Sequence, residues 1–145
     1  MVICSFLYTE SFISRPIPDT ELLYMHPIQT APGKTIISTR VTCKPNAATP
    51  PHTHPGAFIT GYVHRGHILN KMNNEPMQVH GPGDTFREML GCHHKICENL
   101  SKIEEAVFYV TMVVDTAFLE KVGLWGLFLV DEEYRDVATK TMSSA

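Results

Sequence analysis

Two stretches of the sequence decide the fold. Residues 46–66 read N-A-A-T-P-P-H-T-H-P-G-A-F-I-T-G-Y-V-H-R-G and contain His52 and His54, and residues 83–99 read G-D-T-F-R-E-M-L-G-C-H-H-K-I-C-E-N and contain His94. Histidines two positions apart on an extended strand point to the same face, because side chains alternate there. Imidazole nitrogen is a favoured ligand of transition metals. The pattern predicts a metal site in which a third histidine on a neighbouring strand completes the set.

The two stretches resemble the two sequence motifs of the cupin superfamily. In the first motif the matching residues are His52, His54 and Gly66; in the second they are Gly83, Gly91 and His94, with Asn99 one position late. The resemblance implies an all-β fold, a double-stranded β-helix or jelly-roll barrel in a single domain. It also implies a divalent transition metal held by His52, His54 and His94, with iron, zinc, nickel, manganese and copper all remaining open.

The sequence departs from the cupin motifs at three positions. Asn46 replaces a glycine, and asparagine tolerates the left-handed turn that glycine usually makes. Met89 replaces a proline. The motif glutamate is missing, because the positions counted from either end of the motif are Phe58 and Ile59. We therefore expect a site of three neutral imidazoles, whose metal keeps its full charge and favours anionic or enolisable ligands.

Glu88 is the candidate for a catalytic role. It precedes the turn at residues 89–91 and would act as a general base or a fourth ligand, the alternative being a surface carboxylate at a strand end. A substrate pocket is expected from side chains close to the motifs, namely Phe58, Ile59, Gln78, Phe86 and Met89. For His64, His67 and His93, and for Cys92 and Cys97 beside His94, the structural interpretation is preferred.

The remaining sequence indicates short strands separated by turns. Strands are expected at residues 35–43, 58–63, 67–72, 77–80, 85–88, 94–97 and 106–114, and a short helix at 116–124 followed by an apolar strand at 124–130. This organisation gives an N-terminal arm (residues 1–34), a barrel core (35–115) and a C-terminal extension (116–145) that packs on the barrel or on a partner subunit. We expect a homodimer.

Composition limits the partners. The chain has 145 residues and a formal charge of −3, with acidic and basic residues interspersed, so a nucleic-acid partner is not expected. No apolar run is long enough for a membrane helix. The first ten residues lack a basic start and reach Glu10 before any long apolar run, so a cytoplasmic protein with reduced thiols is expected.

The function predicted from these features is that of a metal-dependent cupin enzyme acting on a small anionic or enolisable organic molecule. Dioxygenase-type oxidation is preferred because a three-histidine site supports it. A Lewis-acid lyase, decarboxylase or isomerase would use the same residues. A cupin that binds a small ligand without turnover, and a structural role in a larger complex, are further alternatives.

Overall fold

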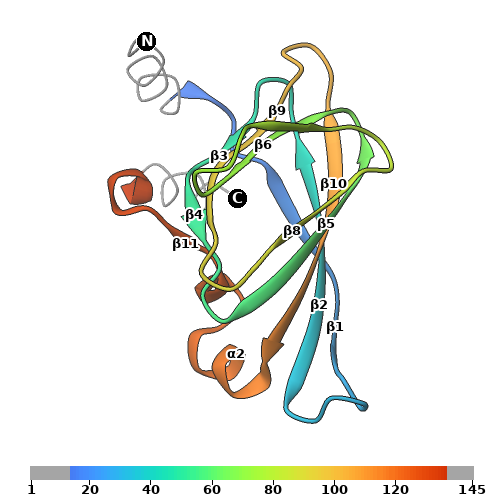
Figure 1. Cartoon of the computed structure of the whole chain (residues 1–145), viewed down its shortest axis with the longest axis vertical. Coiled ribbons are helices and arrows are strands. Elements are labelled where there is room, and N and C mark those ends of the chain that lie inside the picture. The colour runs from blue at the N-terminus through green and yellow to red at the C-terminus, as the bar shows by residue number, and fades with distance from the viewer. Residues whose placement is uncertain (1–13, 137–145) are drawn as a thin grey trace.

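The computed structural model describes residues 14–136, which form two antiparallel β-sheets facing each other (Figure 1). The sequence-based prediction of an all-β jelly roll is confirmed. Every predicted strand of the barrel core is present, and the bounds differ from the predicted ones by no more than a few residues.

The first sheet has five strands and is extended at one edge by the N-terminal arm. Its order is β1 (Asp19–Pro27), β2 (Lys34–Cys43), β10 (Ala106–Asp115), β5 (Ala57–Arg65) and β8 (Thr85–Glu88). All nine residues of β1 are exposed, whereas β2 and β5 alternate between buried and exposed side chains. The alternation places one face of the sheet toward the barrel interior.

The second sheet has six short strands. Its order is β11 (Leu129–Val130), β4 (His52–Thr53), β9 (His93–Asn99), β6 (Ile68–Met72) and β7 (Gln78–His80), with β3 (Ala48–Thr49) also paired to β9. Strand β9 lies at the centre, because it pairs with β3, β4 and β6. The strands that carry His52 and His94, β4 and β9, therefore lie in this one sheet.

Two apolar clusters fill the barrel. The first contains Val41, Cys43, Ala47, Val63, Ile68, Cys97, Ala106 and Phe108, and the second contains Ile37, Ala57, Ile59, Met112, Val114, Leu119 and Leu127. The second cluster includes residues of the C-terminal extension, whose helix α2 (Thr116–Val122) lies at the lower end of the barrel in Figure 1.

Asn46 and Gly66 of the first motif both have a positive φ, which accounts for the residue type at each position. Asn46 has a φ of 63°, so it makes the left-handed turn expected of it. Gly66 has a φ of 75°, and a Cβ there would lie 2.8 Å from the backbone of Ala106. Only glycine satisfies both conditions.

The C-terminal extension differs from the prediction. A strand was expected over residues 124–130, but a 3-10 helix occupies Trp125–Leu127 and only Leu129–Val130 form a strand. The reason is that Gly123 ends α2 in a left-handed conformation, and Gly126 packs closely against Val122, so the chain turns back instead of extending. Within residues 14–136, no helix is both long and apolar enough to cross a bilayer.

Candidate metal centre

The strand register brings the histidines together. His52 on β4 is the cross-strand partner of His94 on β9, and their ring centroids are 5.0 Å apart. His54, two positions after His52, lies on the same side, with its ring edge-on to His52 at a centroid distance of 4.7 Å. His52 and His94 are both buried, at 3% and 2% exposure.

Backbone carbonyls orient the first two imidazoles. His52 Nδ1 donates to the carbonyl of Pro50 at 2.7 Å, and His54 Nδ1 donates to the carbonyl of Leu127 at 2.8 Å. A carbonyl only accepts hydrogen bonds, so in each neutral ring Nδ1 carries the proton and Nε2 keeps its lone pair. Both rings therefore present Nε2 as the ligand atom.

The third imidazole is oriented by a side chain. His94 Nε2 donates to Asn70 Oδ1 on β6 at 2.6 Å, so Nδ1 is the ring nitrogen that faces Glu88 Oε1. Asn70 is 3% exposed, so its amide is enclosed with the ring that it orients. Asn70 was missed by the sequence analysis, although the alternation of β6 places it on the inner face between Ile68 and Met72.

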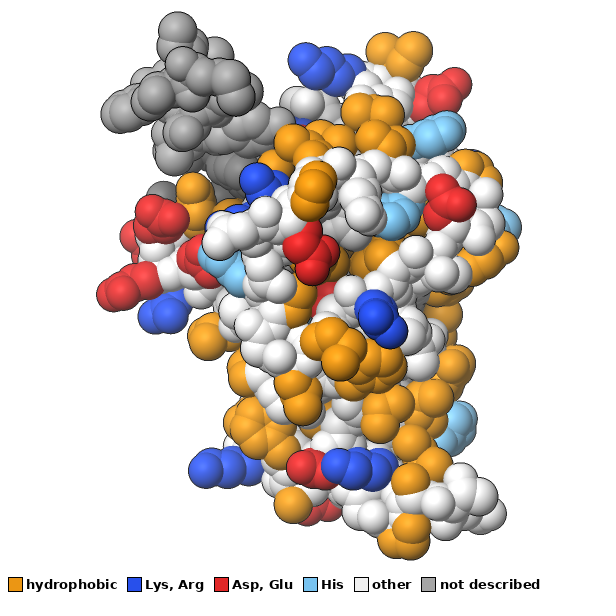
Figure 2. Space-filling model, in the orientation of Figure 1, with side chains coloured by type: hydrophobic (Ala, Val, Ile, Leu, Met, Phe, Trp, Pro, Cys, Tyr) orange, Lys and Arg blue, Asp and Glu red, His pale blue; other side chains and the backbone are white. Residues whose placement is uncertain are grey.

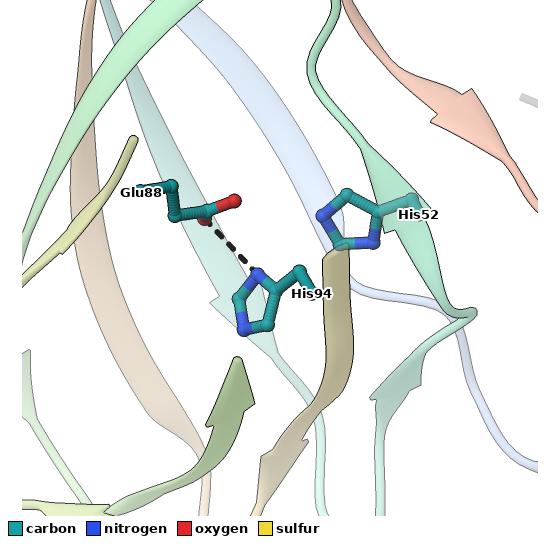
Figure 3. Close-up of side chains that lie close together, drawn as sticks. All are labelled: His52, Glu88 and His94. Carbon is teal, nitrogen blue, oxygen red and sulfur yellow. Dashed lines mark ion pairs between the residues drawn. The ribbon is translucent and has the colours of Figure 1, made fainter. Parts of the chain in front are cut away.

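Glu88 supplies the carboxylate that the motif lacks. It is only 4% exposed, and its Oε1 lies 3.0 Å from His94 Nδ1 while its Oε2 lies 3.7 Å from His54 Nε2. Figure 3 shows the carboxylate and the His94 ring pointing toward each other, with His52 across from them. In the antiparallel β5–β8 pair, Glu88 stands directly opposite Ile59, one of the two positions counted for the motif glutamate. The expectation of a site without a carboxylate is therefore corrected.

Burial and neighbouring groups set the protonation states. Burial, followed by the proximity of His94 and His54, holds the pKa of His52 well below 6.5, and burial also lowers the pKa of His54. Burial on its own would raise the pKa of Glu88, but interaction with His94 and the charge of His54 outweigh it and lower the pKa below 4.5. At neutral pH the site therefore contains two neutral imidazoles and an ionised carboxylate.

The donor set fits a divalent ion. One ligand atom each of His52, Glu88 and His94 lies within 4.8 Å of the others, near the separation that ligand bonds of roughly 2.0–2.2 Å require. Glu88 Oε2 and His94 Nδ1 are buried without a hydrogen-bond partner, although His94 Nδ1 is ion-paired with Glu88. A carboxylate oxygen buried without a donor is stabilised when a cation binds beside it. The residues present thus fit a metal such as iron or zinc.

Comparison with known proteins identifies the family. The family model of the cupin domain matches residues 39–113, just over half of the chain. This protein belongs to the cupin family. No curated protein sequence matches the chain significantly.

Solved structures resemble this cupin in fold at low sequence identity. KdgF from Halomonas sp. is 16% identical with a TM-score of 0.56, the match covering 73% of this chain and 88% of that one. DMSP lyase DddQ from Ruegeria pomeroyi is 18% identical with a TM-score of 0.55, over 69% of this chain and 48% of that one. An oxalate oxidase in complex with glycolate is 21% identical with a TM-score of 0.55, over 92% and 77%. These likenesses establish the jelly-roll fold of the cupin.

The predicted substrate pocket is only partly assembled by the structure. Phe86 lies beside the site, with its ring centroid 6.3 Å from that of His94, and Gln78 faces Asn70 across the β6–β7 pair at an exposed position. Ile59 is fully buried in the second apolar cluster.

Two pocket residues lie elsewhere, contrary to the prediction. Phe58 is 37% exposed, because alternation along β5 turns it outward between the inward-facing Ala57 and Ile59. Met89 is 58% exposed, because it lies in the turn that follows β8. Neither contributes to an inner wall of the barrel.

The residues interpreted as structural lie outside the metal centre. His93 faces away from His94 and pairs with Asp131, its Nε2 lying 2.9 Å from Oδ2. His64 and His67 are exposed. Burial raises the pKa of Cys92 and that of Cys97, so both remain protonated thiols at neutral pH. Cys4 lies outside the described residues.

The surface of the cupin shows no single-sign charge patch on the face in Figure 2. Basic and acidic side chains are interspersed there, and apolar side chains reach the surface in the middle of this face.

Phe128 is the second residue that the sequence analysis missed. Its ring centroid lies 4.4 Å from that of His52. It belongs to the C-terminal extension, beyond residues 39–113 that match the cupin domain. No motif or spacing pointed to it.

Proposed function

We propose that this cupin is a metal-dependent enzyme that oxidises a small anionic or enolisable organic molecule. The observation that supports the proposal most is the grouping of His52, Glu88 and His94. Two histidines and one carboxylate around open positions form the donor set that is characteristic of non-haem iron(II) oxygenases. One of the solved structures similar in fold, an oxalate oxidase in complex with glycolate, also belongs to an oxidative enzyme.

The residues of the site have separate roles in this proposal. His52, His94 and Glu88 hold the metal, and His54, predicted as a third histidine ligand, lies outside this group with its Nε2 3.7 Å from Glu88 Oε2. A bound divalent ion supplies Lewis acidity and, if it is iron, one-electron chemistry with dioxygen. The Glu88 carboxylate reduces the local positive charge, so a monoanionic substrate balances a divalent ion.

The substrate class follows from the charges around Glu88. Within residues 14–136, its ion pairs are with His54 and His94 and with no Lys or Arg. An anionic substrate group therefore depends on the metal for its positive partner. Phe86 offers apolar surface beside the site, and such surface limits the access of water to the reacting group.

A lyase or isomerase is the second candidate, and Glu88 is the observation in its favour. Its lowered pKa keeps the carboxylate ionised, and its Oε2 has no hydrogen-bond partner. Such an oxygen accepts a proton from a carbon acidified by an adjacent carbonyl group. A solved structure similar in fold, a DMSP lyase, fits this class.

Metal content followed by a comparison of aerobic and anaerobic turnover tests the proposal. Untagged wild-type protein, His52→Ala and His94→Ala are analysed for metals by mass spectrometry after reconstitution with iron, zinc, nickel, manganese and copper separately. His64→Ala, an exposed histidine on β5, is the matched control. We expect near-stoichiometric metal in the wild type and His64→Ala, and loss in the two site variants.

Loaded protein is then offered small carboxylates, β-diketones and thiols with and without dioxygen. Oxygen uptake with product formation supports the oxidation. Product formation without dioxygen favours the lyase or isomerase. If the protein binds metal but forms no product with or without dioxygen, the proposal of an enzyme is contradicted and a ligand-binding cupin is favoured. If the wild-type protein takes up no metal, the metal site itself is contradicted.

A further inference from the structure

We infer that two residues of the C-terminal segment 124–131 orient the metal ligands, Leu127 through its backbone carbonyl and Phe128 through its ring, and that Phe128 is the positioning residue. The inference rests on the proposed function, because it concerns how the metal ligands are held. The segment lies outside the part of the chain that matches the cupin domain, residues 39–113. Three sets of contacts carry the inference.

The first contact fixes the protonated nitrogen of His54. The Leu127 carbonyl accepts the hydrogen bond from His54 Nδ1 at 2.8 Å, and the Leu127 side chain is buried in the second apolar cluster at 1% exposure. The acceptor is therefore anchored by its own side chain. With Nδ1 bound in this way, Nε2 of His54 faces Glu88 at 3.7 Å.

The second contact is a ring packed on His52. The Phe128 centroid lies 4.4 Å from that of His52 at an interplanar angle of 37°, and 5.6 Å from that of His54. His52 also has the ring of His94 at 5.0 Å. Aromatic neighbours on several sides leave the His52 ring little room to rotate. Phe128 is the neighbour that comes from outside the motifs.

The third set of contacts ties the segment to the histidine-bearing strand. Strand β11 pairs with β4 so that Val130 stands opposite His52, and the backbone N–H of Asp131 donates to the Pro51 carbonyl at 2.9 Å. The Asp131 carboxylate also contacts His93 Nε2, at 2.9 and 3.1 Å. These contacts hold the chain directly after Leu127 and Phe128 against the strand that carries His52.

Outer contacts of this kind affect metal affinity. Groups that orient ligating histidines typically change affinity by about 10- to 100-fold when they are removed. Replacing Phe128 with alanine frees the His52 ring to adopt other orientations. We expect Phe128→Ala to weaken metal binding by about tenfold or more, without altering any ligand atom.

Cobalt(II) titration of the full-length protein tests this expectation. The visible absorption of bound cobalt reports affinity and ligand geometry together, and circular dichroism confirms folding. Leu129→Ala is the matched control, because Leu129 is the next residue and is 48% exposed. Phe128→Ala should weaken cobalt binding and change its spectrum, whereas Leu129→Ala should stay within about twofold of the wild type. Equal affinities and spectra in the two variants would overturn the inference.

A measurement on metal-free protein separates this inference from the proposed function. Nitrogen-15 NMR reports which nitrogen of His52 and His54 carries the proton. In wild type and Leu129→Ala both rings should be Nδ1-protonated, and in Phe128→Ala the His52 signals should show exchange between forms. Unchanged His52 signals in Phe128→Ala would contradict the positioning role even if the protein binds no metal. Phe128→Leu, which keeps part of the packing, replaces Phe128→Ala should the latter not fold.

Discussion

The two sheets of the barrel contribute different chemistry to one site. The six-stranded sheet supplies His52, His94 and the orienting amide of Asn70, whereas the five-stranded sheet supplies only the carboxylate of Glu88. The imidazoles of His52 and His94 are brought together by the pairing of β4 with β9 within one sheet. The Glu88 carboxylate meets them only when the two sheets close on each other. The site therefore forms only when the two sheets of the barrel pack against each other, and one motif alone does not form it.

The position of Glu88 shows how a motif residue is replaced from a neighbouring strand. Ile59 and Glu88 are direct partners in the β5–β8 pair. Side chains opposite each other in an antiparallel pair project from the same face with their Cβ atoms about 4.5–5.5 Å apart. Glu88 on β8 therefore projects from the same face of the sheet as Ile59 on β5, whose side chain is buried in the core.

The largest expected effect comes from exchanging these two residues. Glu88→Ile removes the only carboxylate of the His52–Glu88–His94 group and should weaken metal binding by about 100-fold or more. Adding Ile59→Glu in the same protein should restore at least about tenfold of the loss, because the two positions share one face. Isothermal titration with zinc measures both values.

Glu75→Gln is the control for this exchange, because Glu75 is exposed in the turn between β6 and β7. It should bind metal like the wild type. If the double variant were folded but bound metal no better than Glu88→Ile, the equivalence of the two strand positions would be wrong.

A smaller effect is expected from the six-stranded side. Asn70→Leu removes the acceptor of His94 Nε2, so the ring loses its fixed orientation and a buried N–H is left unpaired. We expect metal affinity to fall by about 10- to 100-fold and the free energy of unfolding of the metal-free protein to fall by about 1–3 kcal/mol. Urea unfolding measures the second quantity. Asn74→Ala, at an exposed position, should change neither the metal affinity nor the free energy of unfolding. If Asn70→Leu matched Asn74→Ala in both quantities, the orienting role of Asn70 would be wrong.

The smallest expected effect is on the pH dependence of stability. The pKa of His52 and that of His54 lie below 6.5 in the folded protein, so the unfolded chain binds more protons as the pH falls below 6.5. Stability of the metal-free protein should therefore be full above pH 6.5 and decrease below it. The lowered pKa of Glu88 adds a further loss below 4.5.

Urea unfolding at several pH values measures this dependence. His52→Gln should show a shallower decrease below pH 6.5, while His64→Gln should follow the wild type. A wild-type stability that stayed constant from pH 7.5 to well below 6.5 would contradict the protonation states assigned to the site.

The sequence was sufficient for most of the fold and for part of the site. Alternation and turn residues located the barrel strands, and His-x-His spacing with the second motif singled out His52, His54 and His94, which the structure brings side by side. Glu88 was also singled out, but its direction was not, because a residue at a strand end faces inward or outward depending on register. The homodimer remains a prediction.

The sequence by itself determined the strands of the barrel core and the histidine ligands, since both depend on local alternation, turn conformations and the spacing of residues within the motifs. Only the tertiary structure decided which carboxylate joins the histidines and what orients them. Glu88 on β8, Asn70 on β6 and Phe128 just before β11 reach the site through pairings between distant parts of the chain. Such pairings depend on sheet register and on closure of the barrel, and neither can be predicted from the spacing of residues along a short stretch of sequence.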